Sequence, residues 1–276
     1  MPLLLVMGLA SQMLMWETDF CELLAARGFR VIRYDNRDVG QSTILRGAPT
    51  PKRWQLALRD PKGAPYSLQD MAGDAVGLLD HLQIPAAHVV GASMGGMIAQ
   101  ALAIGHPDRV LSLVSIMSTT GNRRVGRARP RLALRMLRRV AGDRDGYIRD
   151  HIRTYREIGS PAYSFDEATR RELAGRMYDR GIHPAGGARQ MAAIVTTSDR
   201  TADLQNFSLP TTVIHGDVDP LVNVSGGRAT AAAIPGARLM IIPGMGHDLS
   251  RQCWPQIADA IAENTERASA VPDAGA

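Results

Sequence analysis

The sequence predicts an α/β protein with a mostly parallel central sheet and helices on both faces. Three observations favour this class. Short apolar runs rich in Val, Ile and Leu alternate with segments of helical period, as in repeated β–α units. The composition, 45% hydrophobic and 21% charged, is ordinary for a globular protein. The 276 residues suffice for one large α/β domain, alone or with an insertion.

The expected strands are apolar runs of the kind found in parallel strands that are buried on both faces. In chain order they are residues 3–7, 30–34, 88–91, 110–116, 211–215 and 238–242. Segments with helical spacing of apolar residues separate them and predict helices near 16–27, 70–83, 94–105, 225–234 and 255–264. This order of elements predicts β–α–β connections and therefore a parallel sheet.

The segment from 119 to 200 interrupts this alternation. It contains helical pieces such as RLALRMLRRV and GYIRDHIRTYREI, and no convincing strand. We therefore expect a core made of residues 1–118 and 201–276, with 119–200 as a helical insertion over the sheet. From about residue 266 to 276 the chain is small, polar and interrupted by a proline, which predicts a disordered tail.

The net charge of +5 is concentrated in the insertion. Residues 118–200 contain eighteen arginines, no lysine and nine acidic residues, a net of +9, so the rest of the chain is near −4. Aromatic residues make up only 5% of the chain and no nucleic-acid motif is visible, so we expect no nucleic-acid partner. Two interpretations of the basic segment stay open: a solvated basic face, or a surface that binds acidic substrates or anionic lipid.

Two cysteines, Cys21 and Cys253, are too few for a disulfide framework and lack metal-ligand spacing, which predicts free thiols. No apolar stretch reaches the roughly 20 residues that a membrane span needs. The apolar N-terminus has no basic residue before Arg27, which disfavours a secretory signal. We therefore expect a cytoplasmic protein.

The stretch VVGASMGGMIAQ, residues 89–100, places a serine between glycines where a strand should give way to a helix. It contains G-x-S-x-G, centred on Ser93, the pattern of a sharp turn that exposes a nucleophilic serine. The flanking glycines let neighbouring backbone pass close to the turn. The helix that follows favours negative charge at its N-terminus. A glycine-rich turn that binds nothing is the alternative, unless a base for the serine is found.

A nucleophilic serine needs a base, and the base needs an orienting carboxylate. HGDVDPLV follows the strand expected at 211–215, and PGMGH follows the strand expected at 238–242. Both segments should emerge at the carboxyl edge of the sheet, where ligands bind in open α/β folds. His247 is the predicted base and Asp219 the predicted acid, whereas Asp217 is expected to hydrogen-bond within its own turn.

The other histidines are expected in surface or capping positions. They are His81, His88, His106, His151, His183 and His215. Catalysis at Ser93 also needs donors for an oxyanion, and one should be the backbone N–H of Met94. The other should come from the loop after the first strand, where Gly8 permits a sharp turn and the N–H of Leu9 is the candidate.

These residues resemble the α/β-hydrolase superfamily over nearly the whole chain, from LLLVMG to PGMGH. Further matches narrow the resemblance. The loop after the first strand reads MGLA where many members have HG, and GGMIAQ follows the elbow serine. YDNRDVGQS, residues 34–42, is similar to the family turn D-x-R-G-x-G-x-S, with Asp38 in place of a usual glycine. Together they resemble the bacterial branch that contains aclacinomycin methylesterase and lipase-like carboxylesterases.

The resemblance implies a serine carboxylesterase that hydrolyses a small to medium apolar ester through an acyl-serine, without metal or cofactor. It assigns the triad to Ser93, Asp219 and His247, the oxyanion amides to Leu9 and Met94, and a scaffolding role to residues 35–42. Alternative uses of the same triad are perhydrolysis, C–C bond hydrolysis and acyl transfer. A non-catalytic ligand-binding protein on this scaffold also remains open.

The resemblance also implies that residues 119–200 form a helical cap over the site. Most apolar residues of the cap are expected to pack, while a minority face a ligand. They are Leu132, Leu134, Met136, Leu137, Ile148, Ile152, Met177, Met191 and Ile194. One departure concerns the sheet, because the family usually has two strands before the oxyanion strand. Either the sheet lacks these two strands or the chain is shortened. Both alternatives predict an exposed sheet edge, and the oligomeric state stays open.

Overall fold

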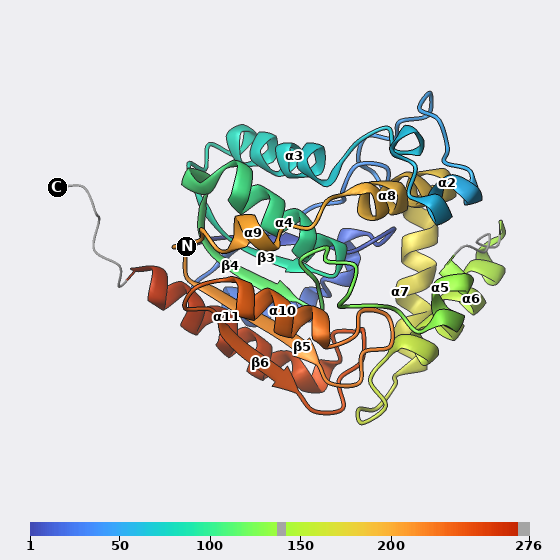
Figure 1. The fold of residues 1–276 in the computed structure, drawn as a ribbon. Helices are drawn as coiled ribbons and strands as arrows, with labels where there is room; N and C mark the ends of the chain where they lie inside the picture. Colours follow the sequence, from blue (N-terminus) through green and yellow to red (C-terminus); the bar gives the residue numbers. More distant parts are fainter. Residues whose placement is uncertain (137–141, 270–276) are drawn as a thin grey trace.

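The computed structural model describes residues 1–136 and 142–269. Its centre is a six-stranded, all-parallel sheet with strand order β2-β1-β3-β4-β5-β6 (Figure 1). The strands are β1 (Pro2–Val6), β2 (Arg30–Arg33), β3 (Ala87–Ala92), β4 (Val110–Ile116), β5 (Thr211–Gly216) and β6 (Arg238–Ile242). Each lies within one residue of the run expected from its apolar pattern. The predicted α/β class is confirmed.

Helices cover both faces of the sheet because successive strand residues point to opposite sides. In β1, Leu4 and Val6 belong to the apolar cluster under α3 (Leu68–His81) and α4 (Met94–Gly105). Leu3 and Leu5 belong to the opposite cluster, under α1 (Thr18–Ala25) and α11 (Trp254–Ser269). All four leucine and valine side chains have no exposed surface, and each such burial contributes about 1.5–3 kcal/mol.

The remaining core elements complete these layers. The helix α10 (Ser225–Ala233) contributes Ala233 to the cluster under α3 and α4. The short helix α9 (Thr201–Leu204) precedes β5. Single 3-10 turns are η1 (Met13–Met15), η2 (Pro61–Gly63), η3 (Pro107–Arg109) and η4 (Arg251–Cys253). Cys21 and Cys253 are free thiols. Among the described residues, no helix is long and apolar enough to cross a bilayer.

The segment 119–200 lies beyond the carboxyl ends of the strands (Figure 1). It forms α5 (Pro130–Met136), α6 (Arg144–Ile158), α7 (Glu167–Arg180) and α8 (Pro184–Thr196), and its described part contains no strand, as the sequence predicts. Aspartates begin two of these helices: Asp143 accepts from the N–H of Gly146 at 2.7 Å, and Asp166 from that of Thr169 at 3.0 Å. Such N-caps satisfy amides that a helix leaves free.

The structure differs from the expected elements at α2, at the short helix α9 and at the end of α11. The helix α2 (Arg53–Leu58) was not expected, because it is one and a half turns long and buries none of its side chains, so it leaves no apolar period in the sequence. The helix α11 continues to Ser269, four residues into the segment expected as a tail. Arg267 anchors this last turn by donating to the carbonyl oxygens of Thr211 and Gly236. Residues 270–276 lie outside the described part.

The sheet edge on the N-terminal side is β2 rather than β1, which pairs with β2 and β3. Arginines stand at both ends of this edge strand. Arg30 is exposed, and Arg33 donates to the carbonyl oxygen of Trp16 and to the hydroxyl of Thr18. Charged side chains on an edge strand disfavour pairing with another sheet.

Candidate active site

The turn after β3 holds Ser93 in a strained conformation, with φ 57° and ψ −120°. A Cβ at Gly91 would lie 2.2 Å from the carbonyl oxygen of Gly95, and a Cβ at Gly95 would lie 2.0 Å from that of Val6. Only glycine fits these two positions, so close contacts in the turn explain both glycines of the G-x-S-x-G pattern. The serine N–H donates to Ile116 at 2.9 Å, which ties the turn to β4. Its side chain therefore leaves the sheet edge in a fixed direction.

The structure brings Ser93, His247 and Asp219 into one chain of hydrogen bonds. The Nε2 of His247 lies 2.9 Å from the Oγ of Ser93, and its Nδ1 lies 2.6 Å from the Oδ2 of Asp219. A carboxylate can only accept, so Nδ1 carries the proton and Nε2 is left to accept the serine proton. This is the tautomer that a general base needs. The three residues come from the ends of β3, β5 and β6, as the sequence predicts.

Asp219 is held as a carboxylate by its surroundings. Burial alone would raise its pKa, but the facing His247, a hydrogen bond from His215 and the amides of its own loop together hold the pKa well below its usual value. Its Oδ1 accepts from the N–H groups of Leu221 and Val222, both at 2.8 Å. The other oxygen therefore remains directed at the imidazole. The expectation that Asp217 bonds within its own turn is wrong, because its side chain accepts from the N–H of Gly244, 27 residues away, at 2.6 Å and so shapes the loop that precedes His247.

Two other histidines are buried, contrary to the surface or capping positions expected for them. His215 has no exposed surface; its Nε2 lies 2.8 Å from the carbonyl oxygen of Val222 and 3.5 Å from Asp219. His88 lies in β3, 4% exposed, with Nδ1 2.9 Å from the hydroxyl of Ser112, and burial lowers its pKa to about 4. Central strands of a covered sheet bury polar residues together with apolar ones. His215 thus supports the carboxylate, a role that no local pattern indicated.

The two amides expected to bind an oxyanion, those of Leu9 and Met94, border the same cavity as the serine. Met94 begins α4, whose first N–H groups have no partner within the helix. The loop that contains Leu9 passes close to the nucleophile, because a Cβ at Gly8 would lie 3.2 Å from the Cβ of Ser93. Both residues therefore lie beside the serine.

Side chains distant in sequence fix the shape of this loop, which runs from Met7 to Met13. The amide of Gln190, in α8, accepts from the N–H of Ala10 and donates to the carbonyl oxygen of Arg37, both at 2.8 Å. Asn36 donates to the carbonyl oxygen of Met7 at 2.8 Å. Asp35 accepts from the N–H of Met13 at 2.7 Å and pairs with Arg180 at 2.6 Å. The loop after β2 and the cap segment therefore support the expected oxyanion loop from two sides.

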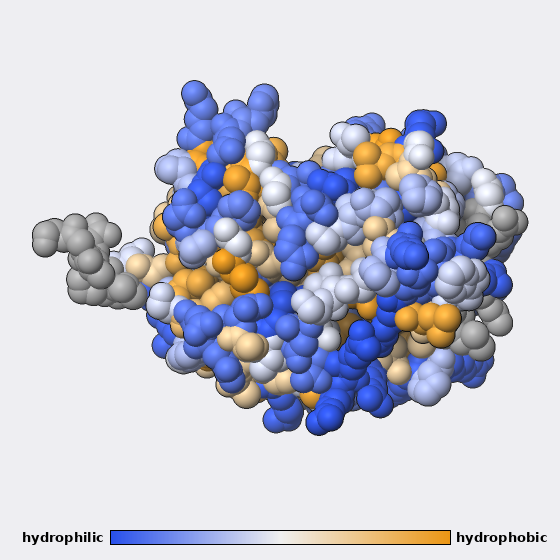
Figure 2. Space-filling view, turned by 45° about the horizontal axis from the view of Figure 1, so that its top comes forward, coloured by the Kyte–Doolittle hydropathy of each residue, from blue (hydrophilic) through white to orange (hydrophobic). Residues whose placement is uncertain are grey.

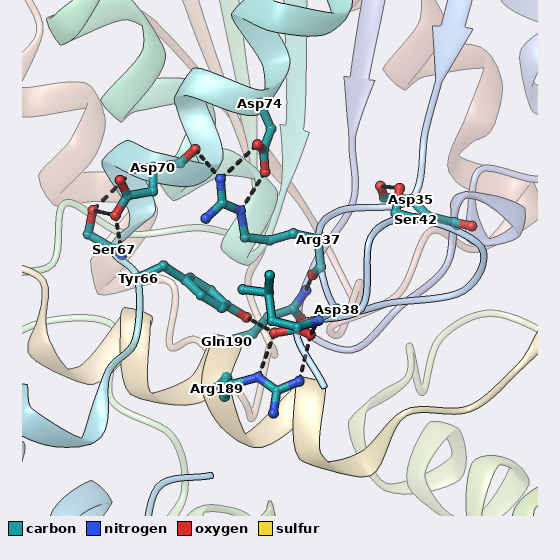
Figure 3. A network of polar contacts seen from close by, with 11 residues as sticks. Asp35, Arg37, Asp38, Ser42, Tyr66, Ser67, Asp70, Asp74, Arg189 and Gln190 are labelled. Carbon is teal, nitrogen blue, oxygen red and sulfur yellow. Dashed lines mark hydrogen bonds and ion pairs between the residues drawn. The ribbon is translucent and has the colours of Figure 1, made fainter. Parts of the chain in front are cut away.

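Asp38 forms a second buried ion pair, shown in Figure 3. It is fully buried and accepts two hydrogen bonds from Arg189 of α8, at 2.6 and 2.7 Å, and one from the hydroxyl of Tyr66 at 2.9 Å. Its φ of 69° explains why glycine is usual at this place in the family turn. The adjacent Arg37 pairs with Asp74 of α3 at 2.6 Å. Residues 35–42 thus act as a scaffold that joins the core to α8.

Ser93 and His247 line a cavity of about 1020 Å³, at the upper end of typical ligand pockets. Methionines from core and cap segment dominate its apolar wall, among them Met7, Met94, Met97, Met117, Met177 and Met191. Of the cap residues expected to face a ligand or to pack, Met177, Met191 and Ile194 line the cavity, whereas Leu132, Ile148 and Ile152 are buried packing residues. The side chains of Leu134 and Met136, and all of Leu137, lie outside the described part.

Comparison with known proteins finds the alpha/beta hydrolase fold family, whose model matches residues 1–250. Rhodomycin D methylesterase DauP of Streptomyces sp. (strain C5) is 31% identical over 294 residues, which cover 97% of this chain and 92% of that protein. The 3-oxoadipate enol-lactonase 2 of Acinetobacter baylyi is 26% identical, over 80% of this chain and 72% of the lactonase.

Solved structures agree with this similarity. A hydrolase from Pseudomonas aeruginosa PA01 matches with a TM-score of 0.66 and 25% identity, covering 98% of this chain and 89% of that one. A thermophilic esterase from Thermogutta terrifontis matches with a TM-score of 0.70 at 24% identity, covering 97% and 90%. The fold is therefore shared along the whole described chain.

Proposed function

The chain belongs to the α/β-hydrolase family and is an esterase, and we propose that it hydrolyses carboxylic esters through an acyl-serine formed on Ser93. One observation supports this mechanism above all. The serine hydroxyl, the His247 imidazole and the Asp219 carboxylate are joined at 2.9 and 2.6 Å at the wall of a cavity large enough for a substrate. A nucleophile bonded to a base, and a base bonded to a buried acid, is the arrangement that acyl transfer requires.

In the proposed acylation, Oγ of Ser93 attacks the ester carbonyl carbon while Nε2 of His247 takes its proton. The carbonyl oxygen becomes an oxyanion, to which the N–H groups of Leu9 and Met94 donate. The tetrahedral intermediate then collapses, the alcohol leaves, and it receives the proton from His247. Asp219 stabilises the transient imidazolium by charge and by holding its Nδ1–H.

Deacylation repeats these steps with water in place of the serine. Nε2 takes a proton from water as its oxygen attacks the acyl carbon, and the proton returns to Ser93 when the acyl group leaves as a carboxylic acid. The three contacts that Gln190, Asn36 and Asp35 make with the loop keep the oxyanion amides in place through both steps. We propose that residues 119–200 act as the cap, which closes the cavity and supplies part of its apolar wall.

The substrate class that fits best is a methyl ester of a bulky, largely apolar acid. The similarity to rhodomycin D methylesterase extends over nearly the whole chain, and the cavity is wide and apolar. Tyr147 and Tyr155 of α6 line it and add an aromatic wall suited to a planar acyl group. A lactone is an internal ester, so the similarity to an enol-lactonase is consistent with the same chemistry.

The experiment is hydrolysis of p-nitrophenyl butyrate and of a methyl-ester series, by the wild type and by Ser93→Ala. We expect kcat/KM of the variant to fall by about 10⁴-fold or more, with unchanged circular dichroism and melting temperature. Activity of the variant above about a hundredth of wild type would exclude an acyl-serine on this residue. Product analysis with added peroxide or alcohol separates hydrolysis from perhydrolysis and acyl transfer.

A further inference from the structure

Five arginines line the cavity that contains Ser93, and three of them are exposed to solvent. Arg59 follows α2, and Arg123 and Arg127 lie in the loop between β4 and α5; all three line the cavity and are exposed to solvent. Here they are called the rim arginines. The Nε of Arg127 donates to the backbone carbonyl of Arg123 at 2.7 Å, so the two loop arginines are neighbours.

The rim arginines lack the carboxylate partners that many other arginines of the molecule have. Arg144, Arg156, Arg171, Arg180 and Arg189 of the cap segment all pair with carboxylates. Within residues 1–136 and 142–269, no acidic side chain forms an ion pair with a rim arginine. The basic excess seen in the sequence therefore includes arginines whose charge is matched by a carboxylate and arginines, the rim group among them, whose charge is not.

Three carboxylates also border the cavity, and each already has a partner; Asp150 lies 3.7 Å from Arg153. Glu17 lies 2.7 Å from Arg251 and 3.6 Å from Arg170. Asp248 accepts from the hydroxyls of Ser160 and Ser250 at 2.5 and 2.9 Å. They are held by these partners and do not neutralise the rim.

The rim arginines are close enough to repel one another. Partial burial lowers the pKa of Arg59, and the charges of Arg123 and Arg127 lower it further. Like charges gathered without counter-charge cost free energy, and a bound anion would recover it. Guanidinium groups are the preferred protein partners of carboxylate and phosphate oxygens, because their forked donors match two oxygens at once.

We propose that the rim arginines form an anion subsite, and that the natural ester has a carboxylate or phosphate group remote from its scissile bond. This rests on the proposed function, since it describes the far end of the substrate that Ser93 attacks. The apolar wall binds the body of the substrate, the rim arginines bind its anionic end, and the ester lies between Ser93 and the two amides. The anionic group selects the substrate and orients it in a cavity otherwise wide enough for several poses.

A membrane surface is the competing partner for this rim. The helix α2 exposes Trp54 at 52% and Leu58 at 75%, directly before Arg59. Figure 2 shows apolar groups reaching the surface among hydrophilic ones on the side where α2 and α8 lie. The rim arginines, however, line the cavity itself, which favours an anion that enters with the substrate. Anionic vesicles therefore form a separate arm of the test.

The test compares monomethyl suberate, which has a free carboxylate at neutral pH, with dimethyl suberate. We expect the wild type to prefer the charged ester by about 10-fold in kcat/KM at low salt, and to lose this preference in 0.5 M NaCl. In Arg59→Gln/Arg123→Gln/Arg127→Gln, KM for the charged ester should rise about 10-fold or more, and the preference for the charged over the neutral ester should be lost. The matched control is Arg124→Gln, an exposed arginine of the same loop that does not line the cavity.

Two outcomes would overturn the proposal. One is an equal preference for the charged ester in the wild type and the triple variant. The other is rim-dependent sedimentation with phosphatidylglycerol vesicles combined with no preference between the two esters, which would assign the rim to a lipid surface. Equilibrium binding of monomethyl suberate to Ser93→Ala separates this proposal from the mechanism. Binding that depends on the rim arginines supports the subsite even if no ester is hydrolysed, and binding that does not depend on them contradicts it.

Discussion

Two buried aspartates lie in different regions of the site. Asp219 is the expected acid of the triad, in the loop after β5, and Asp38 lies in the loop after β2, which supports the expected oxyanion loop. They are 4% and 0% exposed, and each faces a side-chain nitrogen at the same distance, 2.6 Å. Asp219 faces a histidine whose second nitrogen reaches the cavity and a serine hydroxyl. Asp38 faces Arg189, which uses two donors on the same carboxylate and never loses its proton.

The difference lies in what the partner can do. An imidazole can gain a proton on one nitrogen while it donates from the other, so the pair with Asp219 suits proton transfer. A guanidinium cannot, so the pair with Asp38 can only hold structure, and it joins the core to α8. Equal burial and equal distance therefore correspond to different roles, and the predictions below separate them.

The largest expected effect is that of Asp219→Asn on kcat. The Asn amide would donate to Nδ1 of His247 and leave Nε2 protonated, unable to accept from Ser93. By analogy with triads of this type, kcat should fall about 10⁴-fold with little change in stability. The measurement is kcat beside the urea-unfolding free energy. A loss of less than about 10-fold would mean that the carboxylate does not set the tautomer.

For Asp38→Asn we expect the reverse, a large loss of stability and a small change in kcat. Asn tolerates the positive φ at this position, but Arg189 would become a buried charge without a carboxylate. Removing one partner of such a pair costs about 3–5 kcal/mol of unfolding free energy. Below its melting temperature the variant should keep kcat within about 10-fold of wild type. An unchanged unfolding free energy would show that the pair does not stabilise the link to α8.

Gln190 tests whether the cap segment acts on chemistry through the oxyanion loop. In Gln190→Leu the N–H of Ala10 loses its acceptor, and the loop that contains Leu9 is less well held. We expect kcat to fall about 10- to 100-fold, with a parallel loss of affinity for a phosphonate transition-state analogue and an unchanged KM. Gln190→Glu, which keeps an acceptor oxygen, should lie between this variant and wild type. A change in KM alone would argue against loop positioning.

The smallest effect concerns His151, a half-buried base whose buried Nε2 has no hydrogen-bond partner in the described chain. Burial, with the charge of Arg170, lowers its pKa to about 3. The unfolded chain then binds a proton below about pH 6.5 while the folded chain does not, so stability is lost as the pH falls from there toward 3. Between pH 7 and 5, the unfolding free energy of His151→Phe should fall by about 1–2 kcal/mol less than that of the wild type. Identical losses in both proteins would show that His151 is not buried in its neutral form.

Much of the sheet and of the candidate site could be predicted, because each signal is local. Apolar runs mark the strands to within one residue. Ser93, Asp219 and His247 each follow a strand end within a few residues, so a parallel sheet has to bring them to one edge. The glycines beside Ser93 are required by close backbone contacts within the turn itself.

The supporting contacts could not be predicted, because they join residues far apart in the chain without a periodic pattern. Gln190 and Ala10 are 180 residues apart, and Arg189 and Asp38 are 151 apart. Asp38 at a usual glycine position indicated unusual backbone, but not its partner. The arginine excess was visible in composition, whereas its division into paired and unpaired groups depends on tertiary structure.

The most direct measurement of the central claim is mass-spectrometric mapping of the adduct that the wild-type enzyme forms with a fluorophosphonate. We expect a single adduct on Ser93, with much slower labelling of His247→Ala because the base is missing. An adduct on another residue, or an enzyme that hydrolyses esters while Ser93 remains unlabelled, would contradict it.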